Sequence, residues 1–209
     1  MDFLSNIVQQ VLTIFYNFTN MLGFPNYGLA IILMTVAIKI ILYPITAKQI
    51  SSMKKMSELQ PKMKELQEKF KHDKQRLNQE MADLYRREGA NPLSGCLPLL
   101  IQMPILISIF YGIRDYSYIG TPEWFWIKDL AQADPTYILP VVSALSTYVQ
   151  SKQTITDPNN PQNKIMLYFM PLFIGYISLQ FPAGLVLYWI ITNLMQIAQQ
   201  WLITSKSTN

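Results

Sequence analysis

The chain has 209 residues, of which half are apolar and only 14% are charged, and its formal net charge is +4. These values exclude an ordinary soluble domain and are typical of a compact protein that crosses a membrane several times. The single cysteine, Cys96, excludes an intramolecular disulfide and a cysteine-based metal cluster, and we interpret it as a small packing residue.

The first 25 residues carry apolar side chains at alternating steps of four and three residues. They are Leu4, Val8, Val11, Phe15, Phe18 and Leu22. This spacing predicts an amphipathic helix over residues 1–25 that lies along the outer membrane interface. The stretch has neither a basic leader region nor a small-residue cleavage site, so we do not expect a signal peptide. Whether the N-terminus is produced by processing is an open question at this point.

Hydropathy predicts five membrane spans, over residues 27–47, 93–113, 136–152, 164–180 and 183–203. The connection 48–90 carries eleven Lys and Arg against seven Asp and Glu, whereas the connection 114–135 carries two against four. Basic residues concentrate on the cytoplasmic side of membrane proteins. We therefore expect the N-terminus outside, segment 48–90 in the cytoplasm and the C-terminus in the cytoplasm.

Segment 48–90 has the pattern of a helical hairpin. One apolar stripe precedes a polar break at residues 71–74 and a second stripe follows it; together they comprise Leu59, Met63, Leu66, Phe70, Leu77, Met81 and Leu84. Two such stripes pair as antiparallel helices. Pro61 marks either a kink or the first turn of the outgoing helix, and Gly89 closes the return helix.

The positive charge of this hairpin has three interpretations. It orients the protein in the membrane, it contacts anionic lipid headgroups, or it docks to an RNA-rich or acidic partner such as a ribosome. The interleaved acidic residues argue against a dedicated nucleic-acid surface, and we expect no DNA binding.

Lys39 is the charged residue of the first span. An ammonium group in the middle of a bilayer costs about 2.5–3.5 kcal/mol on insertion scales. On a continuous helix it shares a face with Thr35, Tyr43 and Thr46. No predicted span contains an Asp or Glu that could pair with it, so Lys39 is a functional candidate.

Three other spans carry uncharged polar side chains. The candidates are Gln102 in the second span, Thr147 and Gln150 in the third, and Tyr188, Trp189, Asn193 and Gln196 in the fifth. One interpretation turns these side chains and Lys39 toward one another around a wet cavity, because lipid-facing polar groups are costly. In the alternative, the amides and hydroxyls bond the helices together, which we favour for Ser143, Thr147 and Thr192.

The predicted spans contain no set of Asp, Glu, His or Cys that could hold a metal or form an acid–base pair. The chain has no glycine-rich phosphate loop either. We therefore expect neither an enzyme nor a cofactor. Three classes remain for a buried cation reached from the cytoplasm: an anion transporter or channel, a lipid-handling protein, and a device that receives acidic polypeptide segments. The absence of an internal repeat weakens the transporter class.

Three motifs make the chain similar to a known family. A charged first span is followed by YPIT (43–46), by MSELQPKMKELQEKFKHDKQRLNQEMADLYRREGANPLSGCLPLLIQMPI (56–105) and by FPAGLVLYWIITN (181–193). With these motifs the chain resembles the YidC/Oxa/Alb family of membrane protein insertases over about residues 23–204. It resembles the short, five-span bacterial form, without the extra N-terminal span and the large periplasmic domain of the Gram-negative form.

The resemblance implies an all-α protein of the bacterial plasma membrane, with five spans around a hydrophilic groove that opens to the cytoplasm and to lipid. A positive residue in the first span would draw in the acidic tail of a client, whose hydrophobic segment then slides into the bilayer. Nascent membrane proteins and lipid are the implied partners, and the Sec translocon and the ribosome stay open. The tail after Trp201 has one lysine, which makes a tail-based ribosome contact doubtful.

The groove charge of the family falls on Lys39, where the family usually has arginine. Lysine lacks the planar fork that binds a carboxylate through two hydrogen bonds, and it loses its proton when it is desolvated. We therefore predict that Lys39 stays charged because its groove is wet. Tyr188 and Trp189 match family positions that contact clients, Gln102 lies in the second-span motif, and Gln150 is proposed on spacing alone.

Overall fold

The structure, a computed structural model, describes residues 2–91, 97–120, 122–155 and 161–206. Cys96 and the first residues of the second predicted span lie outside these ranges. In chain order the helices are α1 (Asp2–Met21), α2 (Tyr27–Ile41), α3 (Tyr43–Lys69), α4 (Lys74–Glu88), α5 (Leu97–Arg114), α6 (Ile138–Thr154), α7 (Pro161–Lys164), the π-helical turn η2 (Ile165–Phe169), α8 (Met170–Ser178) and α9 (Ala183–Lys206). The described residues form no strand beyond one isolated backbone bridge, Trp124–Ile127. The predicted all-α class is confirmed.

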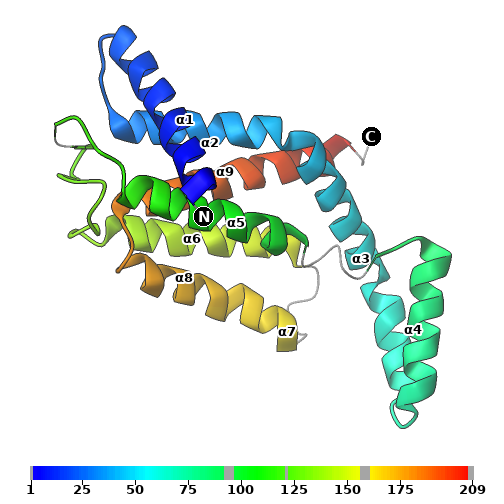
Figure 1. Cartoon of the computed structure of the whole chain (residues 1–209). Coiled ribbons are helices and arrows are strands. Elements are labelled where there is room, and N and C mark those ends of the chain that lie inside the picture. The colour runs from blue at the N-terminus through cyan, green and yellow to red at the C-terminus, as the bar shows by residue number, and fades with distance from the viewer. Residues whose placement is uncertain (1, 92–96, 121, 156–160, 207–209) are drawn as a thin grey trace.

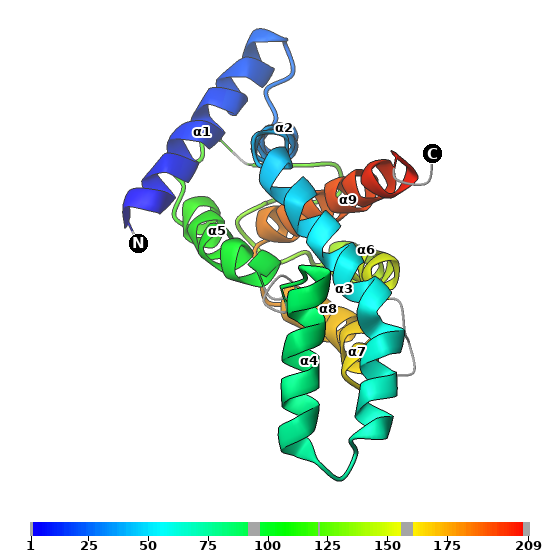
Figure 2. The same ribbon diagram turned by 90° about the vertical axis from the view of Figure 1, so that its right-hand side faces the viewer.

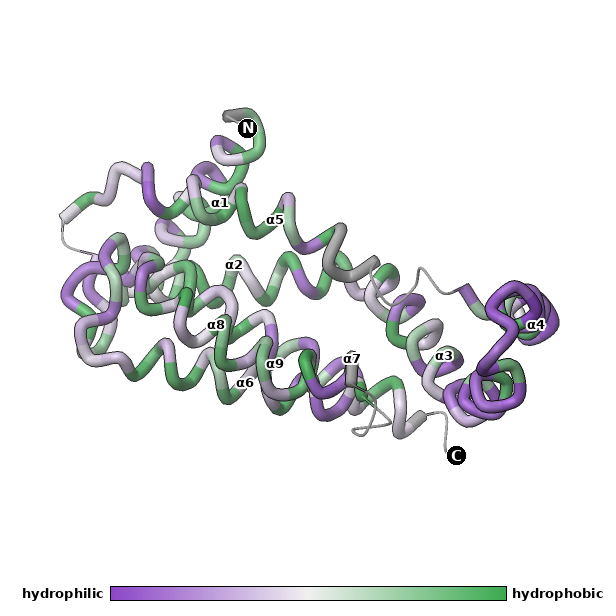
Figure 3. Tube along the Cα trace, turned by 90° about the horizontal axis from the view of Figure 1, so that it is seen from below, coloured by the Kyte–Doolittle hydropathy of each residue, from purple (hydrophilic) through white to green (hydrophobic). Residues whose placement is uncertain are grey.

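The helices form a bundle with a separate hairpin. Helices α2, α5, α6, α8 and α9 run alongside one another, α1 crosses over α2 and α5, and the α3–α4 hairpin projects away from them (Figures 1 and 2). Helix α9 packs against α2, α3, α5 and α6, so it is the element that joins the bundle. Hydrophilic residues concentrate on the hairpin, and hydrophobic residues dominate the bundle (Figure 3).

The first predicted span is not one straight helix. Helix α2 ends at Ile41, and α3 begins at Tyr43 at an angle of 66° to it. Pro44 explains the break, because it has no N–H to continue the hydrogen bonds of α2 and its ring favours a first-turn position in the next helix. By length and composition, no single described helix meets the criterion for crossing a membrane, and the bent pair α2–α3 meets it together.

The hairpin pairs α3 with α4. Leu59 is buried, and the Tyr85 hydroxyl donates a hydrogen bond to Met63 Sδ at 3.8 Å across the pair. Gly89 ends α4 in the left-handed conformation (φ 60°), so its predicted capping role is confirmed. Pro61 lies well inside α3, so the interpretation that it opens the outgoing helix is wrong. The apolar stripe of α3 extends on both sides of Pro61 in the sequence. Pro61 itself is exposed and lies on the opposite face of the helix.

Helix α1 packs on the bundle through the middle of the predicted stripe, where Val8, Val11 and Phe15 are partly buried against the core. Leu12, which is not part of that stripe, is fully buried, whereas Leu4, Phe18 and Leu22 are exposed. Near the C-terminal end of α1, Tyr16 stacks on Tyr27 with the ring centroids 4.0 Å apart.

The connection 114–135 closes over this end of the bundle. Tyr118 lies edge-on to Tyr27 with the centroids 4.9 Å apart, and its hydroxyl donates to the Ile113 carbonyl at 2.9 Å. Burial raises the pKa of the Tyr118 phenol, which therefore stays a hydrogen-bond donor across the physiological range. The carbonyls of Leu130 and Gln132 accept hydrogen bonds from the N–H groups of Gly184 and Ala183, which satisfies the first turn of α9.

Asp134 caps the start of α6. One carboxylate oxygen accepts the Leu139 N–H at 2.8 Å, and the other accepts the N–H and hydroxyl of Thr136 at 2.9 and 2.6 Å. Burial raises the pKa of Asp134, but these hydrogen bonds outweigh it and hold the pKa below its ordinary value of 3.8.

Replacing Asp134 by alanine is expected to lower the free energy of unfolding by about 1–2 kcal/mol, because a helix cap is lost. A carboxyl whose pKa is lower in the folded state stabilises the fold above its unfolded pKa, and this contribution disappears as the pH falls through the folded pKa. Thermal unfolding of the detergent-solubilised protein measures both effects. Asp134→Asn, which keeps an acceptor oxygen, is the control. Equal melting temperatures for the wild type and the alanine variant would contradict the capping role.

Candidate functional site

Polar residues on α9 form one continuous sector of that helix. At about 100° per residue, Tyr188 and Gln199 point to one side of the sector, Asn193 to the other, and Gln196 between them, within about 140°. Their partners come from different helices, namely α2 and α5 on one side and α6 on the other. Helix α9 therefore brings together most of the polar residues that the sequence singles out.

The α6 side of this sector is a closed hydrogen-bond cluster. Thr147 Oγ1 accepts Trp189 Nε1–H at 3.1 Å and Asn193 Nδ2–H at 2.9 Å, and it donates to the Ser143 carbonyl at 2.8 Å. The second Nδ2–H of Asn193 goes to Ser146 Oγ at 3.0 Å. A hydroxyl has one donor and two acceptor sites, so Thr147 is saturated.

This cluster bonds helices to each other, as the alternative interpretation of these residues expects. The hydroxyls of Ser143 and Ser178 extend it to α8, 3.0 Å apart. A client group could hydrogen-bond to Thr147 only by displacing one of its present partners. Of the groups described, Asn193 Oδ1 and one acceptor site of Ser146 Oγ are left on this side.

The α5 side contains one hydrogen bond, from Gln102 Nε2 to the Tyr188 hydroxyl at 3.0 Å. Gln102 is half-buried, whereas Tyr188 is 1% exposed and is one of the largest fully buried side chains. A polar residue of the second predicted span is therefore bonded to one of the fifth. The tyrosine ring lies within the packed core.

Lys39 lies on the α2 side of the sector, in the last turn of α2, and it is 8% exposed. The C-terminal end of a helix carries a partial negative charge, which favours a cation at this position. Within the described ranges, the side-chain ion pairs Lys62–Glu88 and Arg114–Asp115 do not include Lys39, and no carboxylate lies within ion-pair distance of its ammonium group. Gln199 Nε2 donates to the Lys39 carbonyl at 3.3 Å.

The bend at Leu42 changes the predicted face of the first span. Thr35 is fully buried and donates to the Ile31 carbonyl of its own helix at 2.7 Å, so it lies in packed protein. Thr46 is buried as well, whereas Tyr43, beyond the bend, is 38% exposed. The four residues therefore do not share one face as they would on a straight helix.

Two predicted site residues stand apart from the bonded clusters. Gln150 and Gln196 are half-buried, and neither side chain makes a hydrogen bond to another described residue. Gln199 and Ser146, in contrast, take part in the clusters and are absent from the prediction. Gln199 follows Gln196 by three residues, so the helical spacing that singled out Asn193 and Gln196 could have found it.

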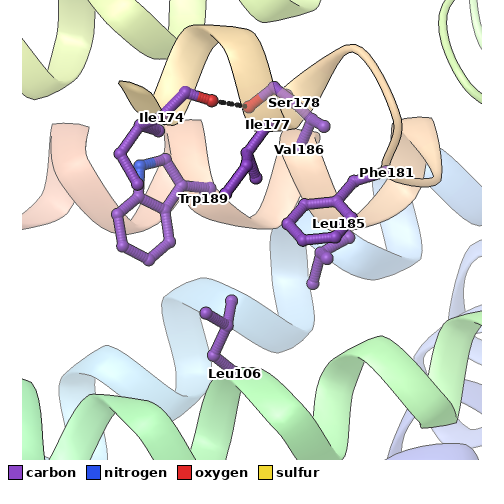
Figure 4. Close-up of a pocket in the computed structure, with 8 residues that line it drawn as sticks. All are labelled: Leu106, Ile174, Ile177, Ser178, Phe181, Leu185, Val186 and Trp189. Atoms are coloured by element: carbon purple, nitrogen blue, oxygen red, sulfur yellow. Dashed lines mark hydrogen bonds between the residues drawn. The ribbon is translucent and has the colours of Figure 1, made fainter. Parts of the chain in front are cut away.

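An apolar pocket opens between α5, α8 and α9. Leu106 faces Trp189 and Leu185 across it, and Ile174, Ile177, Ser178, Phe181 and Val186 complete its lining (Figure 4). The Ser178 hydroxyl is turned back onto the Ile174 carbonyl at 2.7 Å, which leaves the lining almost entirely hydrocarbon. The pocket suits an apolar side chain.

The side chains that meet at the site are suited to binding. Within the described ranges there is no group of three or more His, Cys, Asp or Glu side chains that could hold a metal ion. The site offers a buried cation, amide and hydroxyl groups that are mostly paired, and an apolar pocket between α5, α8 and α9. This combination can attract an anionic segment and accommodate an apolar one.

A family model described as 60Kd inner membrane protein matches residues 17–209 of the chain. The chain is 48% identical over 180 residues to "Membrane protein insertase YidC" of Dechloromonas aromatica (strain RCB), which is 86% of this chain and 33% of that protein. It is 43% identical over 202 residues to the protein of the same name from Polynucleobacter asymbioticus, covering 96% of this chain and 36% of that protein.

The fold is similar to a solved structure as well. A chain described as "Active YidC insertase crystal structure with the first transmembrane domain resolved" matches with a TM-score of 0.71 at 27% identity, over 92% of this chain and 45% of that chain. The chain spans about a third of the length of the curated relatives.

Proposed function

We propose, from the premise that this chain belongs to the family of the 60Kd inner membrane protein and the YidC membrane protein insertases, that it inserts client proteins into the membrane by receiving their acidic tails at Lys39. The observation that carries the proposal is the burial of Lys39 in the last turn of α2 with no described carboxylate to pair with it. The partner of this cation then comes from outside the chain.

The energetics favour a transient ion pair at Lys39. A buried charge without a partner is costly, and an arriving carboxylate relieves part of that cost. A tight, doubly hydrogen-bonded pair would hold the client back, whereas a lysine makes a single, weaker contact. A membrane potential of 100 mV contributes about 2.3 kcal/mol per elementary charge that crosses, which helps to move the acidic tail outward.

The hydrophobic segment of the client is proposed to lie along α8 and α5. The outer surfaces of η2 and α8 are apolar and exposed, which supports a lipid-facing path; their exposed side chains are Ile165, Met166, Tyr168, Phe169, Met170, Leu172, Phe173 and Tyr176. The apolar pocket lined by Leu106 lies between α5, α8 and α9 and adds a second apolar surface. Burial of about 20 apolar client residues in the bilayer supplies the driving force.

The proposed arrangement in the membrane has five spans around a hydrophilic groove, with α1 at the outer interface and the α3–α4 hairpin in the cytoplasm. The tyrosine cluster of α1, α2 and connection 114–135 supports a closed outer end. The basic hairpin supports a cytoplasmic position, where it contacts lipid headgroups and incoming clients. The Sec translocon and the ribosome are further partners to be tested in the same system.

The test uses the purified chain in proteoliposomes with a single-span client that carries an acidic N-terminal tail. Protease protection of the tail measures insertion, and efflux of a small anion from the same vesicles measures the alternative, an anion transporter that uses Lys39. Insertion without anion flux supports the proposal. Anion flux that is lost in Lys39→Ala, with no insertion by either protein, would replace the insertase by a transporter.

A further inference from the structure

Gln199 has an unusual environment for an uncharged polar residue. It lies on α9, it is 4% exposed, and its Nε2 donates to the Lys39 carbonyl at 3.3 Å, 160 residues earlier in the chain. Its Oε1 is buried without a hydrogen-bond partner among the described residues. A buried acceptor without a donor destabilises a fold, whereas an apolar side chain of the same size would avoid this cost.

The bond to Lys39 determines how the amide group is oriented. The carbonyl of Lys39 can only accept, so the nitrogen of the amide has to face it and the oxygen is left over. The unpaired oxygen is therefore a consequence of the contact with α2. Packing alone does not require an amide at this position.

The contact lies at the C-terminal end of α2, where the backbone hydrogen bonds of that helix end. Lys39 is in the last turn of α2, the helix breaks at Leu42, and Pro44 contributes no N–H to the carbonyls of that turn. At the other end of the helix pair, close packing already aligns α2 with α9, since a Cβ on Gly184 would lie 3.1 Å from Ile31 Cδ1. Gln199 adds a second attachment, at the end that carries the cation.

We propose that Gln199 is a positioning residue: its amide ties the end of α2 to α9 and thereby holds Lys39 beside the polar sector of α9 where clients are received. The inference rests on the proposed function. Without this attachment, the end of α2 can move relative to α9 at the bend, and the Lys39 ammonium group spreads over a larger range of positions. An ordered cation contributes more to capturing a tail than a disordered one, because less entropy is lost on binding.

The test compares Gln199→Met with the neighbouring change Gln200→Met. Both replace an α9 glutamine with an unbranched side chain of similar size. Gln200 bonds instead to the end of α6, through the Gln153 carbonyl at 2.9 Å and Thr154 Oγ1 at 3.3 Å. For a client with an acidic tail, Gln199→Met is expected to lower insertion about five- to tenfold, the range for one lost hydrogen bond to a positioned group. A client with a neutral tail, and Gln200→Met with either client, should remain near the wild type.

The comparison of insertion between the acidic-tailed and the neutral-tailed client decides whether Gln199 positions Lys39. An equal loss for acidic and neutral tails in Gln199→Met means a purely structural role and overturns the inference, as does no loss at all. Should Gln199→Met fail to accumulate in the membrane, Gln199→Glu replaces it, because an ionised carboxylate cannot donate to the Lys39 carbonyl. Unchanged preference of that variant for acidic tails would also overturn the inference.

Lys39→Ala separates this inference from the proposed function. If Lys39→Ala reduces insertion of the acidic-tailed client and Gln199→Met does not, only the positioning role fails. If neither variant changes insertion of that client, the electrostatic role of Lys39 fails, and the role of Gln199 fails with it.

Discussion

Lys39→Ala is expected to reduce insertion of clients with acidic N-terminal tails about tenfold or more, whereas Lys39→Arg should retain it. The alanine variant removes the buried cation, and a loss of about 1.4 kcal/mol in tail capture corresponds to tenfold. Arginine keeps the charge and adds a planar fork for carboxylates, so it should capture tails at least as well and release them more slowly. Protease protection of the client tail in proteoliposomes measures both variants.

Lys48→Ala is the matched control for this experiment. It removes one positive charge from an exposed position on α3, nine residues after Lys39, and should leave insertion near the wild-type value. If Lys48→Ala and Lys39→Ala reduce insertion equally, the effect comes from net charge and not from the buried site. Equal activity of Lys39→Ala and the wild type would remove Lys39 from the mechanism for these clients.

Tyr188→Ala is expected to have the largest effect on stability, about 3–5 kcal/mol, which is the range for truncating a large buried side chain. Tyr188 is 1% exposed and packs in the core that α9 forms with α2 and α5. The change also leaves the Gln102 amide without its partner. Chemical unfolding in detergent, followed by tryptophan fluorescence, measures the loss.

Two further variants are controls. One separates the contribution of the Tyr188 ring from that of its hydroxyl, and the other compares Tyr188 with an exposed tyrosine. Tyr188→Phe keeps the ring and should cost only about 1 kcal/mol, the value of one hydrogen bond. Tyr176→Ala truncates a tyrosine that is 63% exposed on α8, and it should leave the unfolding midpoint nearly unchanged. If Tyr188→Ala proves as stable as Tyr176→Ala but blocks insertion, Tyr188 acts mainly by contacting clients and not by packing in the core.

Hydropathy and charge predict most of the helical architecture. The predicted span 183–203 corresponds to α9, and the span 136–152 corresponds to α6 within two residues at each end. Long, strongly patterned segments are predictable because their pattern is repeated over many residues. The bend at Leu42 depends on a single proline next to a hydrophobic run, and a hydropathy average over many residues does not reveal such a bend. On the bent pair Tyr43 is 38% exposed, whereas Thr35 and Thr46 are buried.

The sequence predicts which polar residues belong to the site. It does not predict which of them contact one another. Helical spacing places Trp189 and Asn193 on one face of α9, and they do lie together there. Spacing does not reveal whether that face meets water or the polar face of α6, because both satisfy the same hydrogen-bonding groups. The saturation of Thr147 follows from the three-dimensional arrangement alone. Helical spacing can single out Gln199 but not its partner, since that partner is a backbone carbonyl that no side-chain pattern indicates.

A double-mutant cycle between Lys39 and the client tail tests most directly whether Lys39 receives the tail. Insertion is measured for the wild type and Lys39→Ala, each with a client whose tail aspartates are present or replaced by asparagine. If Lys39 receives the tail carboxylates, neutralising the tail should reduce insertion by the wild type about tenfold and have little further effect in Lys39→Ala, because the two changes remove the same interaction. Independent effects, with tail neutralisation reducing insertion equally in both proteins, would contradict the proposal that Lys39 and the client tail form the decisive contact.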